Sequence, residues 1–469
     1  MPRRTLLVML VASVVALICH ARADRQPYGH YLSEILDIID THYVEPVEDQ
    51  KLFESAVDGM LSQLDEHSSY ITRDGLAELR ENLDQEFGGI GIEVTLDPKT
   101  KELTVLSPLV GTPAYLAGIR AGDKIASVNG ESTAGFSLPD AVRRLRGKAG
   151  DMVRLQIVRK GADKPLDFEV TRAEIPLESV RGDSRRADGT WNFVLAGYPQ
   201  IGYIRINNFG ERTAEEVAAA LDALHAAGVK GLVLDLRENP GGLLNAAVGV
   251  CELFVAPGSL IVTTRGRNGT IDETYRAGGE GRRYDGAMCV LVNRYSASAS
   301  EIVAACLQDY QRAGIVGERS FGKGTVQKVH EVEGGKGVLK LTTSSYWRPS
   351  EKNIHRLSTN QEADEWGVRP DQGCELKLSD DDLLKWHELR RQRDILPPAD
   401  GEQRPDFLSI KPEDAARLDP QMQKAVEMLE RKKNAPGKAL SQGGGGQQPF
   451  PGAIGSDVLV GTIDRCGGA

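Results

Sequence analysis

Ser296-Ala297-Ser298-Ala299-Ser300-Glu301 joins two apolar segments of the chain, residues 288–292 and residues 302–307. The first segment has the length and composition of a buried strand, and the second has the character of a helix. A serine at a turn from strand to helix presents its hydroxyl beside the free amides of the helix N-terminus, and these amides stabilise a developing oxyanion. The stretch therefore predicts a nucleophilic serine at the edge of a sheet.

A second stretch, Phe321-Gly322-Lys323-Gly324-Thr325-Val326-Gln327, places a lysine between two glycines. Glycine lets the backbone bend sharply, so the amine can be held against a neighbouring element. A neutral lysine amine can activate a serine without a histidine. The pKa of a lysine is about 10.4 in water and falls by up to about 3–5 units on burial. We therefore expect a serine protease with a Ser/Lys pair.

The chain around these stretches alternates strands and helices. Residues 201–206 and 231–236 have the apolar character of buried parallel strands, and a helix is expected after each of them. This rhythm predicts an α/β region with a mostly parallel sheet. Sites in such sheets lie at the carboxyl ends of the strands, where both residues 235–242 and residues 296–301 are expected.

Residues 84–174 have a different texture, with short strands and many glycines. A helix is expected from Ser137, and alternating strands at 153–158 and 166–171 close the unit. This unit resembles a PDZ domain. The resemblance implies that consecutive amides of Gly89-Ile90-Gly91-Ile92 cradle a terminal carboxylate while the following strand offers an edge to a peptide. A glycine-rich hairpin without a ligand is the alternative interpretation.

Four motifs together resemble those of the carboxyl-terminal processing proteases, also called tail-specific proteases. They are residues 235–242 (Asp-Leu-Arg-Glu-Asn-Pro-Gly-Gly), 296–301, 320–327 and 367–371 (Gly-Val-Arg-Pro-Asp). The PDZ-like unit also precedes the catalytic region, as in the family. The resemblance runs from about residue 28 to 395 and implies a multidomain α/β fold with a crotonase- or Clp-like protease core.

The resemblance also implies the roles of individual side chains. The nucleophile would be Ser298 rather than Ser296 or Ser300, the general base would be Lys323, and Gln327 would orient the lysine. On an extended strand Lys323 and Gln327 would lie roughly 13 Å apart. The glycine turn must therefore shorten that distance.

The remaining implied features concern the oxyanion hole and the ligands. The amides of Ala299 and of Gly242, chosen narrowly over Gly241, would bind the oxyanion. No metal and no cofactor is expected. The partners would be protein or peptide substrates, recognised by their C-termini.

The N-terminus has the pattern of a secretory signal peptide over residues 1–23. Arg3-Arg4 precede an apolar run from residue 6 to 18, and Ala21-Arg22-Ala23 supplies a small-x-small cleavage site. The run is short for a membrane span. We expect an exported chain that begins at Asp24 and is periplasmic or extracellular, and a location at the membrane surface is compatible with this pattern. The arginine pair leaves the choice between the Sec and the twin-arginine route open.

Three further segments complete the expected organisation of domains. Residues 24–83 predict helices, because apolar residues recur at helical spacing, but the segment is too small to stand alone. Residues 175–395 would form the protease core. Residues 396–469 would form a flexible tail with an amphipathic helix at 411–432 and a Gly/Gln-rich run at 442–448. The helices at the two ends are candidates for self-association into a homo-oligomer.

Composition and spacing argue against several other classes of protein. The net charge of −10 and the pI near 5.5 disfavour a nucleic-acid-binding protein. The six cysteines form no disulfide framework and no CxxC metal spacing. A P-loop would need Ser or Thr directly after Lys323, followed by a helix. Two alternatives stay open: a Ser-His-Asp hydrolase that uses His330 and Asp235, and a secreted peptide-binding scaffold without catalysis.

Overall fold

The computed structural model describes residues 27–73, 75–76, 86–97, 99–278, 281, 283–332, 337–397 and 419–434. The expected signal peptide and the Gly/Gln-rich run lie outside these residues. Among the helices that the structure describes, none is both long and apolar enough to cross a membrane.

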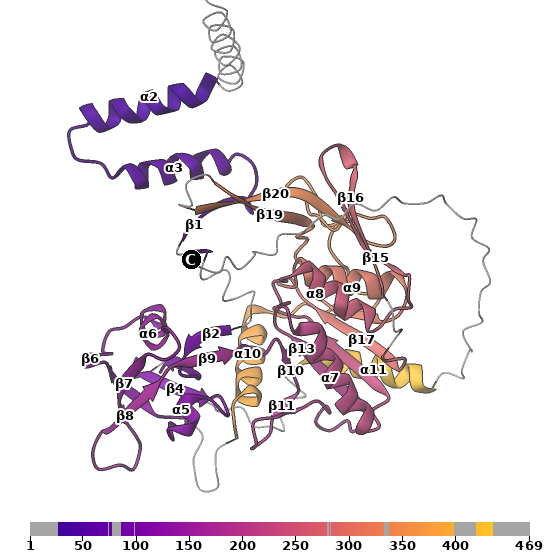
Figure 1. The fold of residues 1–469 in the computed structure, drawn as a ribbon. Coiled ribbons are helices and arrows are strands. Elements are labelled where there is room, and N and C mark those ends of the chain that lie inside the picture. Colours follow the sequence, from indigo (N-terminus) through magenta and orange to yellow (C-terminus); the bar gives the residue numbers. More distant parts are fainter. Residues whose placement is uncertain are drawn as a thin grey trace, which may run out of the picture. The chain divides into compact units, whose positions relative to one another are not determined.

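The N-terminal segment consists of two helices followed by a strand. α2 (Pro27–His42) and α3 (Asp49–Leu61) are the helices expected here (Figure 1). The expectation of helix up to residue 83 is wrong for β1 (Ser69–Thr72), which pairs antiparallel with β20 (Gly337–Trp347). The β-branched and aromatic residues of β1 favour a strand, and the pairing with β20 outweighs the helical pattern before it.

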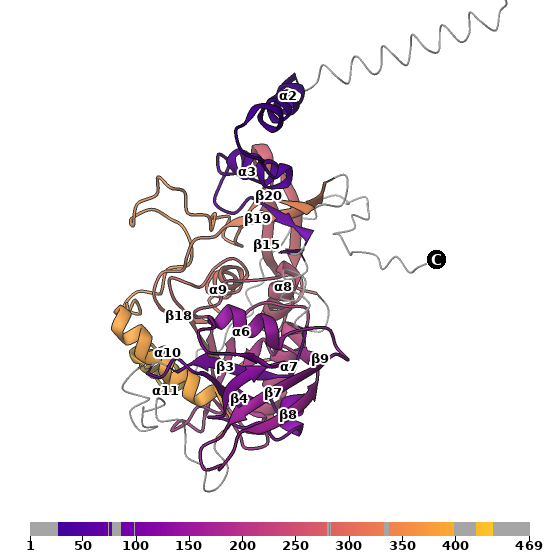
Figure 2. The ribbon, with the colours of Figure 1, turned by 90° about the vertical axis from the view of Figure 1, so that its left-hand side faces the viewer.

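The described part of the PDZ-like unit consists of short strands and two helices, the shorter of which is a single turn. Its elements are β2 (Glu86–Gly89), β3 (Ile92–Leu96), β4 (Leu103–Pro108), α5 (Pro113–Leu116), β5 (Lys124–Val128), β6 (Glu131–Ser132), α6 (Leu138–Leu145), β7 (Met152–Val158), β8 (Leu166–Thr171) and β9 (Ala173–Pro176). One sheet has the order β3-β4-β5-β7-β8, with β6 beside β5, and β2 pairs with β9. Figure 2 shows α6 beside β3. The helix expected from Ser137 and the two strands expected after it are confirmed.

A mostly parallel sheet lies at the centre of the α/β region, as the sequence predicts. Its strands are β10 (Val180–Arg181), β13 (Ile201–Ile206), β14 (Gly231–Asp235), β17 (Ala287–Val292) and β18 (Gly314–Gly317), in this spatial order. The last four run parallel, and β10 is antiparallel to β13. Since β14 and β17 are neighbours, the stretches that follow them leave the sheet at the same edge.

Helices cover both faces of this sheet. One face carries Ile204, Leu234 and Val290, which share a core with α7 (Thr213–Ala226), α8 (Leu244–Glu252) and α9 (Ala299–Asp309). The other face packs against α11 (Pro420–Asn434), through Val426 and Leu429 (Figure 1). The sheet is therefore buried on both sides, which explains the apolar runs of its strands.

α11 corrects the prediction of a flexible tail for residues 419–434. Its apolar face is occupied by the sheet, so this helix does not offer that face to a second copy of the chain. Asp419, directly before the helix, forms an ion pair of 2.9 Å with Arg237. Residues 411–418 of the expected helix lie outside the described residues.

A second, antiparallel sheet lies next to the first and was not predicted from the sequence pattern. It has the order β1-β20-β15-β16, with β15 (Leu260–Arg265) and β16 (Ile271–Arg276), and β19 (Thr325–Glu331) also pairs with β20. β19 directly follows Lys323 and carries Gln327. Three shorter elements, β11 (Ser184–Arg185), β12 (Trp191–Asn192) and η1 (Arg267–Gly269), and the helix α10 (Asp380–Asp394) complete the described elements.

Candidate active site

Ser298 lies at the turn between β17 and α9, as the sequence predicts. Its backbone has a φ of 55° and a ψ of −115°. L-residues rarely adopt such a conformation, which costs about 1–3 kcal/mol and persists only where the surrounding contacts determine it. Strain of this kind is typical of functional sites.

The two neighbouring serines donate their hydroxyl hydrogens to backbone carbonyls. Ser296 Oγ donates to the carbonyl of Leu236 at 2.8 Å, and Ser300 Oγ donates to the carbonyl of Asn239 at 2.9 Å. Both serines are buried, and their hydroxyl hydrogens are used in these bonds. Of the three serines in the stretch, Ser298 is therefore the candidate nucleophile.

Glu301 connects the serine stretch to the lysine stretch. Its side chain is fully buried: Oε2 accepts the N–H groups of Ser298 at 2.9 Å and Lys323 at 2.8 Å. Oε1 accepts the N–H of Gly322 at 2.7 Å and the hydroxyl of Ser320 at 2.5 Å. Burial raises the pKa of Glu301 to about 7, and these hydrogen bonds oppose the rise. One carboxyl group thus fixes the backbone of both segments, a role that the sequence pattern did not indicate for Glu301.

Lys323 lies in a tight turn ahead of β19. Gly322 has a φ of 88°, and the N–H of Gly324 donates to the carbonyl of Gly322 at 3.1 Å. The chain is bent here rather than extended, which is the shape that the spacing of Lys323 and Gln327 requires. Burial, followed by the charge of Lys340, lowers the pKa of Lys323. This environment favours the neutral amine that a general base needs.

The hydroxyl of Ser298 and the amine of Lys323 are not hydrogen-bonded to each other in the described part of the chain. The Ser298 side chain instead forms a hydrogen bond with Tyr346 of β20. Tyr346 is buried, and burial raises its pKa to about 12, so its hydroxyl is neutral at ordinary pH. Sequence reasoning missed Tyr346, because only the pairing of the second sheet brings it to the serine.

Gln327 lies on β19 with both donors of its amide engaged. Its Nε2 donates to Thr325 Oγ1 at 2.9 Å and to Thr342 Oγ1 at 3.3 Å. The carbonyl oxygen is then the end of the amide that remains for another donor. Within the described residues no hydrogen bond joins it to Lys323.

The two loops that carry the predicted oxyanion-hole amides are in contact. A Cβ added to Gly241 would lie 2.8 Å from the Cβ of Ser298. The N–H of Gly241 is occupied, because it donates to Asn239 Oδ1 at 2.9 Å. The N–H groups of Gly242 and Ala299 have no acceptor among the residues that the structure describes. This difference favours Gly242 over Gly241 as a donor to a ligand oxygen.

Two alternative sites do not fit the structure. Lys323 is followed by a strand rather than a helix, which excludes a P-loop. Asp235 is fully buried between Arg237 at 2.6 Å and the hydroxyl of Tyr203 at 2.8 Å. His330 lies on the exposed part of β19. Asp235 is thus engaged by other partners and does not orient that histidine.

The predicted carboxylate cradle lines a groove of about 670 Å³ in the PDZ-like unit. The carbonyls of Ile90 and Gly91 accept the N–H groups of Ala114 and Leu109, each at 2.9 Å. Among the described residues, the N–H groups of Ile90 and Gly91 have no acceptor. The groove is lined by all four predicted residues, Gly89, Ile90, Gly91 and Ile92, and on α6 by Leu138, Val142 and Leu145. Free amides beside an apolar wall suit a peptide that ends in an apolar residue.

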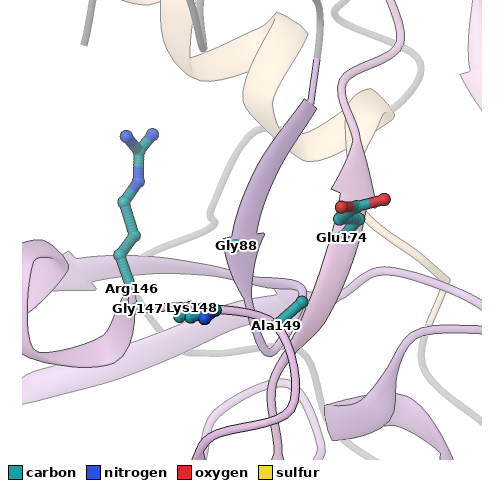
Figure 3. A pocket seen from close by; sticks show the side chains of 6 residues that line it. All are labelled: Gly88, Arg146, Gly147, Lys148, Ala149 and Glu174. Carbon is teal, nitrogen blue, oxygen red and sulfur yellow. The ribbon is translucent and has the colours of Figure 1, made fainter. Parts of the chain in front are cut away.

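A second hollow lies between β2, β9 and the end of α6 (Figure 3). It is lined by Gly88, Arg146, Gly147, Lys148, Ala149 and Glu174. Arg146 also lines the peptide groove, and its guanidinium lies 4.6 Å from the centre of the Phe87 ring. A cationic side chain thus stands near the predicted carboxylate cradle. The sequence alone did not indicate it, because α6 must first end beside β2.

Three segments of the chain match models of known protein families. Residues 200–372 match peptidase family S41, and residues 104–159 match a PDZ domain. Residues 23–75 match the model described as the activating protease CtpB N-terminal domain. The matched segments follow the order of the helical segment, the PDZ-like unit and the α/β region.

Individual proteins are similar over most of the chain. The chain is 40 % identical to the carboxy-terminal-processing protease of Bartonella bacilliformis over 342 residues. This match covers 72 % of this chain and 73 % of that protein. It is 35 % identical over 345 residues to the carboxy-terminal processing protease CtpB of Bacillus subtilis, covering 73 % and 69 % respectively. Among solved structures, a photosystem II D1 C-terminal processing protease is 31 % identical, with a TM-score of 0.40 and coverage of 73 % and 92 %.

Proposed function

Because the chain belongs to peptidase family S41 and is a serine-type carboxy-terminal processing peptidase, we propose that Ser298 is its nucleophile and Lys323 its general base. The observation that carries the proposal is the bridge through Glu301, whose carboxylate accepts the backbone N–H groups of both residues. The lowered pKa of Lys323 and the engagement of Ser296 and Ser300 elsewhere support the same assignment.

The proposed reaction begins when the Ser298 hydroxyl turns from Tyr346 toward Lys323. The neutral amine of Lys323 takes the hydroxyl proton while Ser298 Oγ attacks the scissile carbonyl. The N–H groups of Gly242 and Ala299 bind the oxyanion. Collapse of the tetrahedral intermediate breaks the C–N bond, and Lys323 returns the proton to the leaving amine. Water, deprotonated by the same lysine, then hydrolyses the acyl-enzyme and releases Ser298.

The PDZ-like unit would bind the C-terminus of the substrate. In this proposal the amides of residues 89–92 receive the terminal carboxylate, and the apolar side of the groove receives the last side chain. Gln327 would orient the Lys323 amine through its carbonyl oxygen. The enzyme is thus an endopeptidase that cleaves proteins near their C-termini.

We also propose that the chain acts outside the cytoplasm, in the periplasm or beyond the cell and at the membrane surface. The signal-peptide pattern of residues 1–23 supports this location. Cell fractionation and N-terminal sequencing should find a chain that begins at Asp24 in the exported fraction. A full-length chain retained in the cytoplasm would refute this location.

Self-association through α2 is a further part of the proposal. Tyr31, Ile35 and Ile38 are 56, 53 and 52 % exposed along this helix. Light scattering on the mature chain should give the mass of an oligomer, and Ile35→Glu should give the mass of a monomer. A monomeric wild type would refute it.

Cleavage of an unfolded protein with an apolar C-terminus tests the function. The mature chain, residues 24–469, should cleave it in the presence of EDTA, whereas Ser298→Ala and Lys323→Ala should not. Amidation of the substrate's C-terminus should slow cleavage if the PDZ-like unit binds the carboxylate. Full activity of Lys323→Ala would refute the Ser/Lys mechanism. An inert wild type that still binds peptides would favour the non-catalytic scaffold instead.

A further inference from the structure

A turn formed by Asp65–Ser68 connects α3 to β1 and contacts β20 opposite Gln327. Asp65 Oδ1 accepts the N–H groups of His67 at 2.7 Å and Ser68 at 2.8 Å, and Oδ2 accepts the Ser68 hydroxyl at 2.9 Å. These three bonds close the turn on itself. They leave the Asp65 carboxylate and the Ser68 hydroxyl oxygen as acceptors for the neighbouring strand.

β20 contains a β-bulge at the point where it meets this turn. The register between β19 and β20 shifts just before the pair Gln327–Thr342, so Thr343 is an extra residue. Thr343 Oγ1 is buried without a hydrogen-bond partner among the described residues, and such burial is unfavourable by itself. The N–H of Thr342 donates to Ser68 Oγ at 3.1 Å. The turn thus supplies an acceptor to the bulged strand.

The side chain of Thr342 connects the turn to Gln327 and fixes which of the two groups donates in each hydrogen bond. Burial raises the pKa of Asp65, but the hydrogen bonds of the turn outweigh it and lower the pKa, so the group is ionised at neutral pH. Thr342 Oγ1 donates its one hydrogen to Asp65 Oδ1 at 3.2 Å. Its oxygen must therefore act as acceptor toward Gln327 Nε2, at 3.3 Å. The amide is held with Oε1 at its other end, as the acceptor that the Lys323 ammonium would use.

The turn also lies within electrostatic reach of Lys323. The charges that act on the pKa of Lys323 come from Lys340 on β20, Glu301 on α9 and Glu66 in the turn. Burial, followed by the charge of Lys323, lowers the pKa of His67 in the same turn. The N-terminal segment therefore reaches Gln327 through hydrogen bonds and Lys323 through charge.

We propose that Asp65 and Ser68 are positioning residues for catalysis, which orient the Gln327 amide through Thr342 and complete the active site from the N-terminal segment. This inference rests on the proposed function, in which Lys323 is the base and Gln327 orients it. The active site is then assembled from the N-terminal segment and the α/β region, which are far apart in the sequence. Anything that displaces the turn from β20 lowers the activity without touching Ser298.

Kinetics on the mature chain test the inference with three variants and a matched control. Asp65→Asn allows the hydrogen-bond direction to reverse, Ser68→Ala removes the acceptor of Thr342, and Thr342→Val removes the relay but keeps the branched side chain. The control is Ser62→Ala, because the Ser62 hydroxyl donates to the carbonyl of Gly59 at 2.9 Å at the end of α3. Thermal unfolding followed by circular dichroism identifies a temperature at which all variants are folded, and the kinetics are measured at that temperature.

Each of the three variants should lower kcat roughly tenfold, the effect of one lost hydrogen bond, with KM unchanged. The control should match the wild type. The acid limb of the pH profile should move to lower pH, because an acceptor that stabilises the Lys323 ammonium is lost. Ser68→Thr, which keeps the hydroxyl, should restore most of the rate.

A double-mutant cycle separates positioning from mere stability. In a Gln327→Ala background, Asp65→Asn should have little further effect, because the amide that Asp65 orients through Thr342 is no longer present. An equal loss in both backgrounds would overturn the inference, as would wild-type rates for folded Asp65→Asn and Thr342→Val. If Lys323→Ala itself is fully active, the proposed function fails. If Lys323→Ala is inactive but folded Asp65→Asn, Ser68→Ala and Thr342→Val retain the wild-type rate, the inference fails and the proposed function stands.

Discussion

Glu301→Gln is expected to slow acylation of Ser298, because this carboxylate holds the backbone of both proposed catalytic residues. Each of its oxygens accepts two donors: Ser298 and Lys323 on Oε2, Gly322 and Ser320 on Oε1. A glutamine keeps one oxygen and replaces the other with an NH₂ group, which accepts nothing. Two of the four donors therefore lose their acceptor.

The size of the effect follows from these four bonds. A buried donor without an acceptor costs about 1–3 kcal/mol, so the free energy of unfolding should fall by about 2–6 kcal/mol. If the Ser320 hydroxyl turns to accept from the new amide, only Gly322 is left unpaired and the loss is about 1–3 kcal/mol. A displaced Ser298 or Lys323 backbone should slow acylation by roughly 10- to 100-fold, the rate equivalent of one such bond.

The assay compares this variant with Glu216→Ala in α7. One oxygen of Glu216, Oε2, accepts the N–H and hydroxyl of Ser179 and the N–H of Val180, so alanine removes their shared acceptor away from the serine, whereas glutamine could keep all three bonds. Urea denaturation measures the loss of stability in both variants. A fluorophosphonate that labels the active serine measures acylation at a temperature where both are folded.

Glu216→Ala should lose stability but label at the wild-type rate. Glu301→Gln should lose both stability and rate. The reasoning would be refuted by a folded Glu301→Gln that labels as fast as the wild type. It would be refuted equally if Glu216→Ala slowed labelling to the same extent, because the loss would then be a general effect of lower stability.

Three further predictions concern the base, the serine hydroxyl and the peptide groove. Burial lowers the pKa of Lys323 and its neutral amine is the active form, so labelling should rise with pH through that pKa; a rate that falls with rising pH contradicts a lysine base. Tyr346→Phe removes the hydrogen bond that holds Ser298 and should speed labelling by up to about tenfold; a slower reaction would mean that Tyr346 assists catalysis. In Gly91→Ala, the new Cβ would lie 2.3 Å from the Thr112 side chain at a φ of 77°. Calorimetry should show at least about tenfold weaker binding of a C-terminal peptide with unchanged labelling, and equal binding would refute the cradle.

Local sequence patterns predicted the parts of the site that lie within one turn of the chain. Apolar runs predicted the strand before Ser298 and the helix after it, and the two glycines that flank Lys323 predicted the bend there. The mostly parallel sheet followed from the alternation of such runs. Their roles came from the resemblance to a family, since a serine that begins a helix is by itself only a cap.

Contacts between distant segments could not be predicted in this way. Tyr346 reaches Ser298 only because β20 joins the second sheet, and Asp65 reaches the lysine stretch only because β1 pairs with β20. The sequence did not show that Glu301 connects the serine and lysine stretches, because its role as an acceptor depends on the later turn at Gly322. A helix was predicted at 411–432, and the structure describes it at Pro420–Asn434. Its burial against the sheet was not predicted, since an amphipathic pattern does not indicate which surface its apolar face packs against.

Identification of the serine that reacts tests the Ser298/Lys323 pair directly. The mature chain is labelled with a fluorophosphonate, digested and sequenced by mass spectrometry, beside Lys323→Ala and His330→Ala. We expect a single adduct on Ser298 that is lost in Lys323→Ala and retained in His330→Ala. An adduct on Ser296 or Ser300, or an adduct on Ser298 that survives Lys323→Ala at the wild-type rate, would contradict this pair.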